Sequence, residues 1–364
     1  MRLSRRTLAF GMAVALVATA CSSNSGGSLT KVKFQLQWVA QAQFAGYYAA
    51  VDQGYYKDAG LDVTLLLGGP QVDNVQVVAS GGADIGTAWL PKMLQSRENG
   101  TDLVSIAQVF QRSGTRMVSF KDKNITTMAD FAGKKIGSWL GGNEPELFAA
   151  LTKAGLDPLK QNIIKQNFDM SGLLSGDLDV AQAMIYNEYA QVLEAKNPAT
   201  GNLYQPSDFN LINFNDPSIG TAMLQDQIFA SAKWLSTGSN ADVATKFLTA
   251  SFRGWIYCRD NPAACVQIVL KNGTQLGASH QAWQMNQING LIWPSPNGIG
   301  VLDPALWQQT IGVATKYGVL KAAPSDGAYR TDLATAALAA LGSSVDAKGA
   351  SFQMQTITLN AGGN

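Results

Sequence analysis

Apolar and polar residues alternate along several short stretches in the first third of the chain, and apolar residues at helical spacing follow each stretch. Residues 31–38 (KVKFQLQW) and 61–67 (LDVTLLL) are strand-like, and residues 44–60 between them have helical spacing. Strand, helix and strand with short connections predict a parallel α/β sheet. The pattern continues as helix, strand, helix and strand at 72–82, 83–88, 90–100 and 103–110. One doubly wound lobe is expected.

A second α/β pattern starts near Met117. Its strands are expected at 134–140, 162–168, 178–185 and 209–214, and its helices at 144–155, 170–176 and 186–196. Residues 220–230 (GTAMLQDQIFA) have the composition of a strand that returns to the first lobe. From Ala241 onward the chain is mainly helical, with breaks at Asn261-Pro262 and at residues 293–296 (WPSP).

This order predicts one domain inserted within another. We expect an α/β protein in which two α/β lobes are joined by a two-strand hinge. The first lobe is expected to comprise residues 31–116 and 220–364, including the C-terminal helices, and the second lobe residues 117–219.

The first twenty residues have the three parts of a secretory signal peptide. They contain a positively charged start with three arginines, an apolar run from Leu8 to Val17 and a small-residue end, Ala18-Thr19-Ala20. This pattern predicts a signal peptide at residues 1–20. The adjacent arginines leave the choice between Sec and twin-arginine export open.

Cys21 follows the small residues directly, as in a bacterial lipobox. We therefore expect lipidation of Cys21, a flexible Gly/Ser-rich tether at residues 21–30, and a location on the outer face of the cell membrane. Plain secretion to the periplasm, with cleavage near the same point, is the alternative.

Charge and cysteine usage narrow the partners further. The formal charge is +1, and without the three signal-peptide arginines it becomes −2, which gives no support to nucleic-acid binding. Besides Cys21 the chain has Cys258 and Cys265, on either side of RDNPAA. In an exported protein such a close pair predicts a disulfide, and two buried thiols are the alternative.

Five stretches, in order, carry a resemblance to a known family. They are LQW with FAGYYAAVDQGYYKDAGLDV, then VVASGGADIG, DFAGKKIGSW, LSGDLDVAQAMIYNEYAQVLE and GTAMLQDQIFA, and they cover most of residues 31–230. Through them the chain resembles type II periplasmic binding proteins of ABC importers, in particular the superfamily of the yeast thiamine-pyrimidine synthase and of bacterial pyrimidine- and riboflavin-binding lipoproteins. The resemblance implies the type II periplasmic-binding-protein fold, and an ABC permease and its ATPase as partners.

The eukaryotic branch of that superfamily is an enzyme, and this chain lacks the residues that its chemistry needs. The synthase uses a Lys for a Schiff base, a sacrificial His four residues later and a Cys-rich segment in the return strand. The matching positions here are Ala88, Lys92 and residues 220–223 (GTAM), and the single histidine, His280, lies far away in sequence. We expect no enzyme activity and no cofactor.

Other enzyme classes gain little from the sequence. One His without clustered Cys residues leaves few ligands for a zinc site, so no metal is expected. The context of His280, GASHQAW, is not that of a hydrolase triad. A periplasmic enzyme or a sensor module on the same fold is the alternative from a different functional class.

Four aromatic rings lie at or just after predicted strand ends, where a two-lobed α/β protein places its ligand. These rings are Trp38, Trp89, Trp139 and Tyr186. Together they predict an aromatic clamp around a flat heterocycle, with a core role as the alternative. Tyr48, Tyr55 and Tyr56 have helical spacing and are expected in the core.

Polar side chains near these rings are the candidates for orienting the ligand. The expected ligand contacts other than the four rings are Gln41, Gln43, Tyr47, Asn143, Glu144, Asn187 and Glu188. Amides both donate and accept hydrogen bonds, and a carboxylate accepts them from ring N–H or amino groups. Glu188 is alternatively a solvated helix residue or a partner in helix capping.

The expected function is therefore that of a monomeric binding lipoprotein that delivers an aromatic vitamin or vitamin precursor to an ABC permease and contacts the membrane only through its lipid. Several Trp residues suit a wide planar ligand. Residues 108–114 (QVFQRSG) and 293–300 (WPSPNGIG), which are candidates for hydroxyl contacts or a lid, resemble the riboflavin-binding branch. Riboflavin is the favoured ligand, and a thiamine pyrimidine precursor is the alternative.

Overall fold

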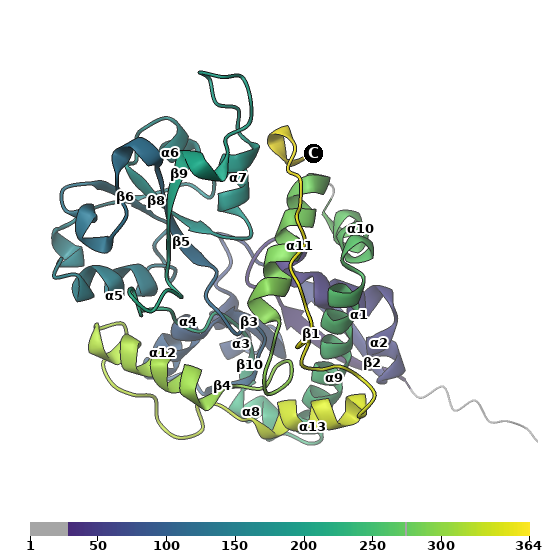
Figure 1. Ribbon diagram of the computed structural model, residues 1–364. Coiled ribbons are helices and arrows are strands. Elements are labelled where there is room, and N and C mark those ends of the chain that lie inside the picture. Colours follow the sequence, from purple (N-terminus) through teal and green to yellow (C-terminus); the bar gives the residue numbers. More distant parts are fainter. Residues whose placement is uncertain (1–27, 274) are drawn as a thin grey trace, which may run out of the picture.

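The structure, a computed structural model, describes residues 28–273 and 275–364 and has two lobes, each built on a five-stranded mixed sheet (Figure 1). The expected signal peptide, the lipidation site Cys21 and most of the expected tether lie outside the described residues. The strand order of the first sheet is β2 (Leu61–Leu66), β1 (Thr30–Gln35), β3 (Ile85–Trp89), β10 (Asp226–Ser231), β4 (Leu103–Gln108). That of the second sheet is β7 (Asn162–Lys165), β6 (Lys135–Ser138), β8 (Val180–Met184), β5 (Thr115–Phe120), β9 (Phe209–Asn213).

Helices cover both faces of each sheet, and α10 and α11 pack on other helices. The α-helices of the described residues are α1 (Ala45–Asp52), α2 (Tyr55–Asp58), α3 (Asn74–Ala79), α4 (Leu90–Glu98), α5 (Pro145–Lys153), α6 (Ser171–Leu174), α7 (Glu188–Glu194), α8 (Ala232–Leu235), α9 (Asn240–Asp260), α10 (Pro262–Asn272), α11 (Ala278–Ile292), α12 (Pro304–Lys316) and α13 (Asp332–Leu341). Side chains from α1 and α9 pack on one face of the first sheet, and side chains from α3, α4 and α12 on the other.

The second sheet shows how strand alternation builds two half-cores. Met117 of β5 faces the cluster that contains α5, and its neighbour Val118 faces the cluster that contains α6 and α7. Successive side chains of a strand point to opposite faces, so a strand that is apolar throughout is buried on both faces. Met117 and Val118 are therefore both fully buried although they point to opposite faces of the sheet.

Two irregular segments, residues 109–114 and 214–225, connect the lobes. The expected return strand at 220–230 is regular only from Asp226, because the backbone before it bonds to side chains. The N–H of Met223 donates to Glu146 Oε1 (2.6 Å), and the N–H of Leu224 donates to Thr310 Oγ1 (3.0 Å).

Glu146 of α5 joins both connecting segments. Besides accepting from Met223, its Oε2 accepts from Ser113 Oγ (2.9 Å) and from Gln225 Nε2 (3.1 Å). The side chain is 3% exposed, and burial raises the pKa of its carboxyl. The Arg116 guanidinium lies nearby and opposes that rise.

The expected helix at 44–60 is divided into α1 and α2 at Gly54, whose φ of +75° suits glycine. The helix α1 approaches α9 very closely. A Cβ atom added to Gly254 would lie 1.9 Å from the carbonyl oxygen of Gly46, and one added to Gly46 would meet the Trp255 ring at 2.2 Å. The missing side chains therefore allow the two helix backbones to touch.

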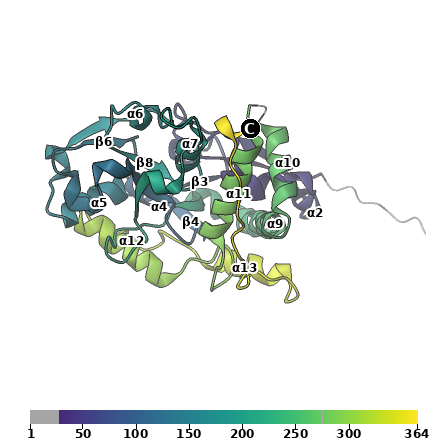
Figure 2. The same cartoon turned by 45° about the horizontal axis from the view of Figure 1, so that its top comes forward.

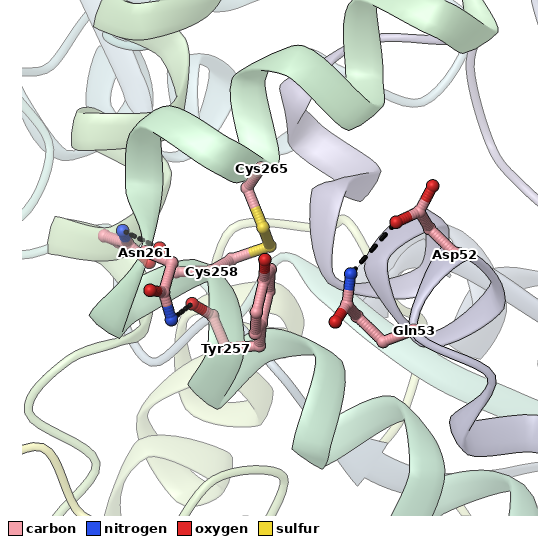
Figure 3. Close-up of a disulfide and its surroundings, with 7 residues drawn as sticks. Asp52, Gln53, Tyr257, Cys258, Asn261 and Cys265 are labelled. Carbon is pink, nitrogen blue, oxygen red and sulfur yellow. Dashed lines mark hydrogen bonds between the residues drawn. A yellow bond between two sulfur atoms is a disulfide. The ribbon is translucent and has the colours of Figure 1, made fainter.

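Cys258 at the end of α9 and Cys265 in α10 form a disulfide, with 5.3 Å between their Cα atoms (Figure 3). The break at Asn261-Pro262 turns the chain between these two helices. The Asn261 side chain donates to the carbonyl of Tyr257 (3.2 Å), so the end of α9 is held by a side chain as well as by the disulfide.

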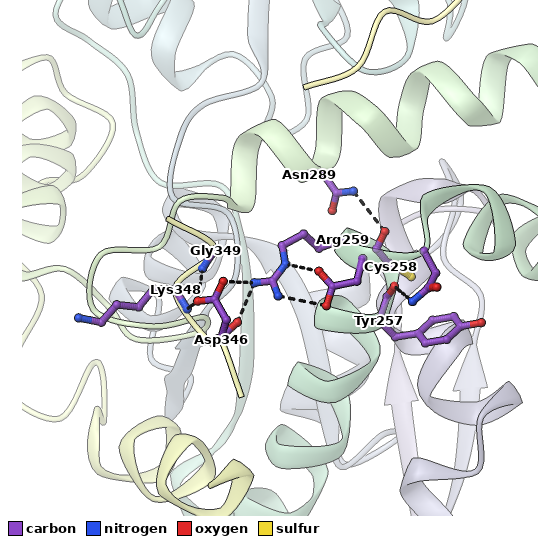
Figure 4. Close-up of polar contacts among 9 residues, drawn as sticks. Tyr257, Cys258, Arg259, Asn289, Asp346, Lys348 and Gly349 are labelled. Atoms are coloured by element: carbon purple, nitrogen blue, oxygen red, sulfur yellow. Dashed lines mark hydrogen bonds and ion pairs between the residues drawn. The ribbon is translucent and has the colours of Figure 1, made fainter. Parts of the chain in front are cut away.

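The C-terminal chain follows α11 over its length, as the views in Figures 1 and 2 show. Arg259 anchors the start of this path (Figure 4). Its guanidinium donates to the Asp346 carbonyl (2.7 Å) and lies 4.7 Å from the centre of the Trp293 ring.

Candidate functional site

A cleft of about 250 Å³ lies between the lobes, at the strand ends of both sheets. Its lining combines aromatic rings, amides and small residues. The lining residues are Gln37, Trp38, Gln41, Gln43, Gly69, Pro70, Val72, Asn74, Trp89, Lys92, Trp139, Leu140, Gly141, Gly142, Asn143, Lys165, Phe168, Met184, Tyr186, Asn187 and Glu188.

The four rings at strand ends meet in this cleft. Trp89 is the last residue of β3, and Trp139 directly follows β6. Trp38 and Tyr186 follow β1 and β8 by a few residues. The fold therefore brings these four sequence-distant rings together in the lining of one cleft.

A fifth ring, Phe168 of the second lobe, was not predicted. Its centre lies 4.8 Å from that of Trp38, with an angle of 55° between the ring planes. The two rings belong to different lobes, so they touch across the cleft. Phe168 follows β7 by three residues, and the rule that identified the four rings at strand ends would also have identified it.

Tyr47 and Glu144, both expected to contact ligand, are not among the lining residues. Tyr47 is 3% exposed and packs in the core of the first lobe, with ring centres 4.8 Å from Phe34 and 5.4 Å from Trp255. It lies on α1 and faces α9. Tyr48 and Tyr56 are buried as expected, whereas Tyr55 is only partly buried, and the Arg253 guanidinium lies 4.0 Å from the centre of its ring. The Glu144 carboxylate accepts from the Gly142 N–H (2.9 Å) and so shapes the glycine loop beside the cleft.

The two segments expected to supply a lid or hydroxyl contacts bond to each other instead. The Gln108 N–H donates to the Gly300 carbonyl (2.9 Å), and the Arg112 side chain donates to the Pro294 carbonyl (3.1 Å). These contacts hold residues 108–114 and 293–300 together beside the lobe connection, away from the lining.

Three glutamines of the cleft lining, Gln37, Gln41 and Gln43, form what we call the cleft floor. Asp226 lies behind this floor, and sequence reasoning missed it. Gln37 Nε2 donates to its Oδ1 (2.5 Å), and Gln43 Nε2 donates to its Oδ2 (2.8 Å). The residue is 5% exposed, and burial raises the pKa of its carboxyl to about 6, although hydrogen bonds from Gln43, Gln37 and Trp89 act in the opposite direction. It is the one charged residue among residues 220–230, which was the available signal.

Glu188 is buried rather than solvated. Its Oε2 accepts from the Met184 N–H (2.9 Å), and its Oε1 accepts from Asn187 Nδ2 (2.7 Å). Burial raises the pKa of the Glu188 carboxyl to about 7. The chain of contacts continues across the lobes, because His280 of α11 lies 2.9 Å from Asn187 Oδ1 and 2.8 Å from Glu194 Oε1.

The cleft also contains two lysines, one from each lobe, Lys92 and Lys165. Lys92 Nζ donates to Asn74 Oδ1 (2.9 Å). Ala88, at the position of the synthase Lys, is fully buried in β3.

Within residues 28–273 and 275–364, no group of three or more His, Cys, Asp or Glu side chains is arranged to hold a metal ion. None of the helices in these residues has the length and apolar character that a membrane span requires.

Two α/β lobes with a ligand-sized cleft at their strand ends define the periplasmic-binding-protein type of fold. The solved structure of the periplasmic nitrate-binding protein NrtA from Synechocystis PCC 6803 has the same fold, with a TM-score of 0.62 at 15% identity over 88% of this chain and 92% of that one. The chain belongs to the NMT1/THI5-like family, whose model matches residues 41–265.

Two relatives are similar over most of their length. The formylaminopyrimidine-binding protein of Halalkalibacterium halodurans is 22% identical over 305 residues, which cover 81% of this chain and 89% of the relative. The riboflavin-binding protein RibY of Chloroflexus aurantiacus is 24% identical over 345 residues, which cover 87% of this chain and 94% of the relative.

Proposed function

We propose that the protein is the solute-binding component of an ABC importer and captures a planar nitrogen heterocycle between its lobes. The observation that carries this proposal is the inter-lobe cleft lined by Trp38, Trp89, Trp139, Tyr186 and Phe168. Each ring stacked on a flat ligand contributes about 0.5–1.5 kcal/mol beyond burial. The amides between the rings supply directional contacts.

A single-ring aminopyrimidine is the ligand class that the cleft supports best. Its volume of about 250 Å³ is below the roughly 300–1,000 Å³ of sites for drug-sized ligands. The similarity to the formylaminopyrimidine-binding protein supports the same choice.

Riboflavin, the ligand favoured by the sequence, is the second candidate. The cleft has five aromatic rings, and a wide planar ligand can contact more of them than one pyrimidine can. The similarity to the riboflavin-binding protein extends over 87% of this chain. Lobe opening would have to enlarge the cleft for the tricycle and its side chain.

Binding without catalysis is part of the proposal. Ala88 stands where the synthase needs an amine, and residues 220–223 lack the Cys-rich segment. We also propose export with a signal peptide at residues 1–20, a lipid anchor at Cys21, a monomeric state, and a permease with its ATPase as partners. The expected lobe boundary at residues 219–220 lies within the connecting segment 214–225 and belongs to the same proposal. The expected boundary at 116–117 falls inside β5 of the second sheet, so we place this boundary in the connecting segment 109–114 instead.

The test is titration of the purified protein with formylaminopyrimidine and with riboflavin, followed by tryptophan fluorescence with correction for flavin absorbance and checked by calorimetry. Saturable binding that Trp38→Ala weakens by about 1–2 kcal/mol, or roughly 5–30-fold, supports the aromatic clamp. Trp234→Ala on α8, outside the cleft lining, is the matched control. If neither compound binds, the proposed ligand class is wrong.

A further inference from the structure

Asp226 determines which way the side-chain amides of Gln37 and Gln43 at the cleft floor are turned. An ionised carboxylate only accepts hydrogen bonds, so a side-chain amide beside it must turn its NH₂ group toward it. Gln37 and Gln43 both do so, at 2.5 Å and 2.8 Å. Their carbonyl oxygens are consequently directed away from Asp226.

Gln43 in turn orients the side-chain amide of Gln41. Because the Gln43 NH₂ group is held by Asp226, its Oε1 is left to accept, and Gln41 Nε2 donates to it (2.7 Å). The Gln41 amide is thereby oriented as well. Among the described residues, neither Gln37 Oε1 nor Gln41 Oε1 accepts a hydrogen bond, and both side chains line the cleft.

We infer that Asp226 is a specificity-determining positioning residue, which makes the cleft floor select heterocycles that present N–H donors, such as an exocyclic amino group, over heterocycles that present a carbonyl at the same place. This inference rests on the proposed function and names its substrate class more closely. A ligand carbonyl facing Gln37 or Gln41 would meet a second acceptor and would leave both oxygens without a donor.

The inference gives Asp226→Asn an unusual expected effect. An Asn has one acceptor oxygen and one NH₂ group, so it accepts from one glutamine and must donate to the other. If Gln37 turns, its own NH₂ group faces the cleft. If Gln43 turns, its NH₂ group points to Gln41, which must then turn its NH₂ group toward the cleft. Either way, one acceptor of the floor becomes a donor.

The experiment uses a matched pair of probes, 4-amino-2-methylpyrimidine and 2-methylpyrimidin-4-one, with riboflavin as a third arm, in calorimetric titrations of the purified protein at pH 8. The wild type should bind the amino probe more tightly by about tenfold or more, since the oxo probe leaves buried polar groups unpaired. Asp226→Asn should abolish or reverse this preference. A general loosening of the site would weaken both probes and leave their ratio unchanged.

Two further variants complete the test. Gln37→Met removes one floor acceptor while Asp226 keeps Gln43, and it should reduce the preference even if Asp226→Asn does not fold. Asp62→Asn, on the exposed side of β2, should leave the preference at the wild-type value.

The possible results separate the inference from the proposed function. Four results would overturn the inference while the binding function stands. They are equal binding of both probes by the wild type, tighter binding of the oxo probe, the wild-type preference retained in folded Asp226→Asn, and an undiminished preference in Gln37→Met. Absence of saturable binding of both probes and of riboflavin would overturn the proposed function and, with it, the inference.

Discussion

Replacing Glu146 by Ala should destabilise the protein by disconnecting the two segments that join the lobes. Three donors lose an acceptor: the Met223 N–H, the Ser113 O–H and the Gln225 NH₂ group. Gln225 keeps a second acceptor, Thr115 Oγ1, at 2.7 Å. Two buried donors therefore remain unpaired, each at about 1–3 kcal/mol, and the expected loss is about 2–6 kcal/mol. Arg116 also loses its neighbouring opposite charge.

The measurement is urea unfolding, with the free energy of unfolding extrapolated to water. Glu146→Gln should lose less than Glu146→Ala, because the remaining carbonyl oxygen can still accept from the Met223 N–H. Asp62→Asn is the exposed control. A loss below about 1 kcal/mol for Glu146→Ala would refute the argument, since a single unpaired buried donor already accounts for that amount.

Two further predictions concern pH and the disulfide. Burial raises the pKa of the Glu188 carboxyl from 4.5 to about 7. The folded state therefore binds this proton more tightly than the unfolded state does. The resulting contribution to stability is present at low pH and is lost as the pH rises through about 7. The difference in free energy of unfolding between Glu188→Gln and the wild type should therefore shift in favour of the variant from pH 5 to pH 8, by up to about 3 kcal/mol. A difference that does not vary with pH would contradict this prediction. Replacing Cys258 and Cys265 by Ser should cost about 2–3 kcal/mol, as expected for a short closed loop, and reductant should lower the melting temperature of the wild type but not that of the double variant. Equal melting temperatures of the two proteins under oxidising conditions would count against a stabilising role.

The sequence predicted the lobes and much of the cleft because both depend on local patterns. Alternating strands and helical spacing identify the α/β units, and ligand-facing loops at strand ends locate Trp38, Trp89 and Trp139 without any knowledge of long-range contacts. The expected return strand was partly wrong for the same reason. Its first residues look strand-like, but their backbone N–H groups bond to Glu146 and Thr310, which no local pattern reveals.

Asp226 shows where such reasoning ends. Its partners Gln43 and Gln37 are 183 and 189 residues away in sequence, and their proximity arises only when the chain returns from the second lobe. Tyr47 is the opposite case, a residue close to the site in sequence but turned away from it in the structure. It lies next to the predicted site in sequence, but the rotation of α1 directs it toward Trp255 and the core.

The close approach of α1 to α9 at Gly46 and Gly254 has a thermodynamic consequence for recognition. Gln41 and Gln43 lie just before α1, so the contact between the two helix backbones fixes the segment that carries them. Immobilising a flexible side chain during binding costs about 0.5–1.5 kcal/mol in conformational entropy. Folding has already ordered these two amides, so a ligand that matches them avoids about 1–3 kcal/mol of that cost. A mismatched ligand gains nothing from the rigidity, because the amides cannot turn to accommodate it.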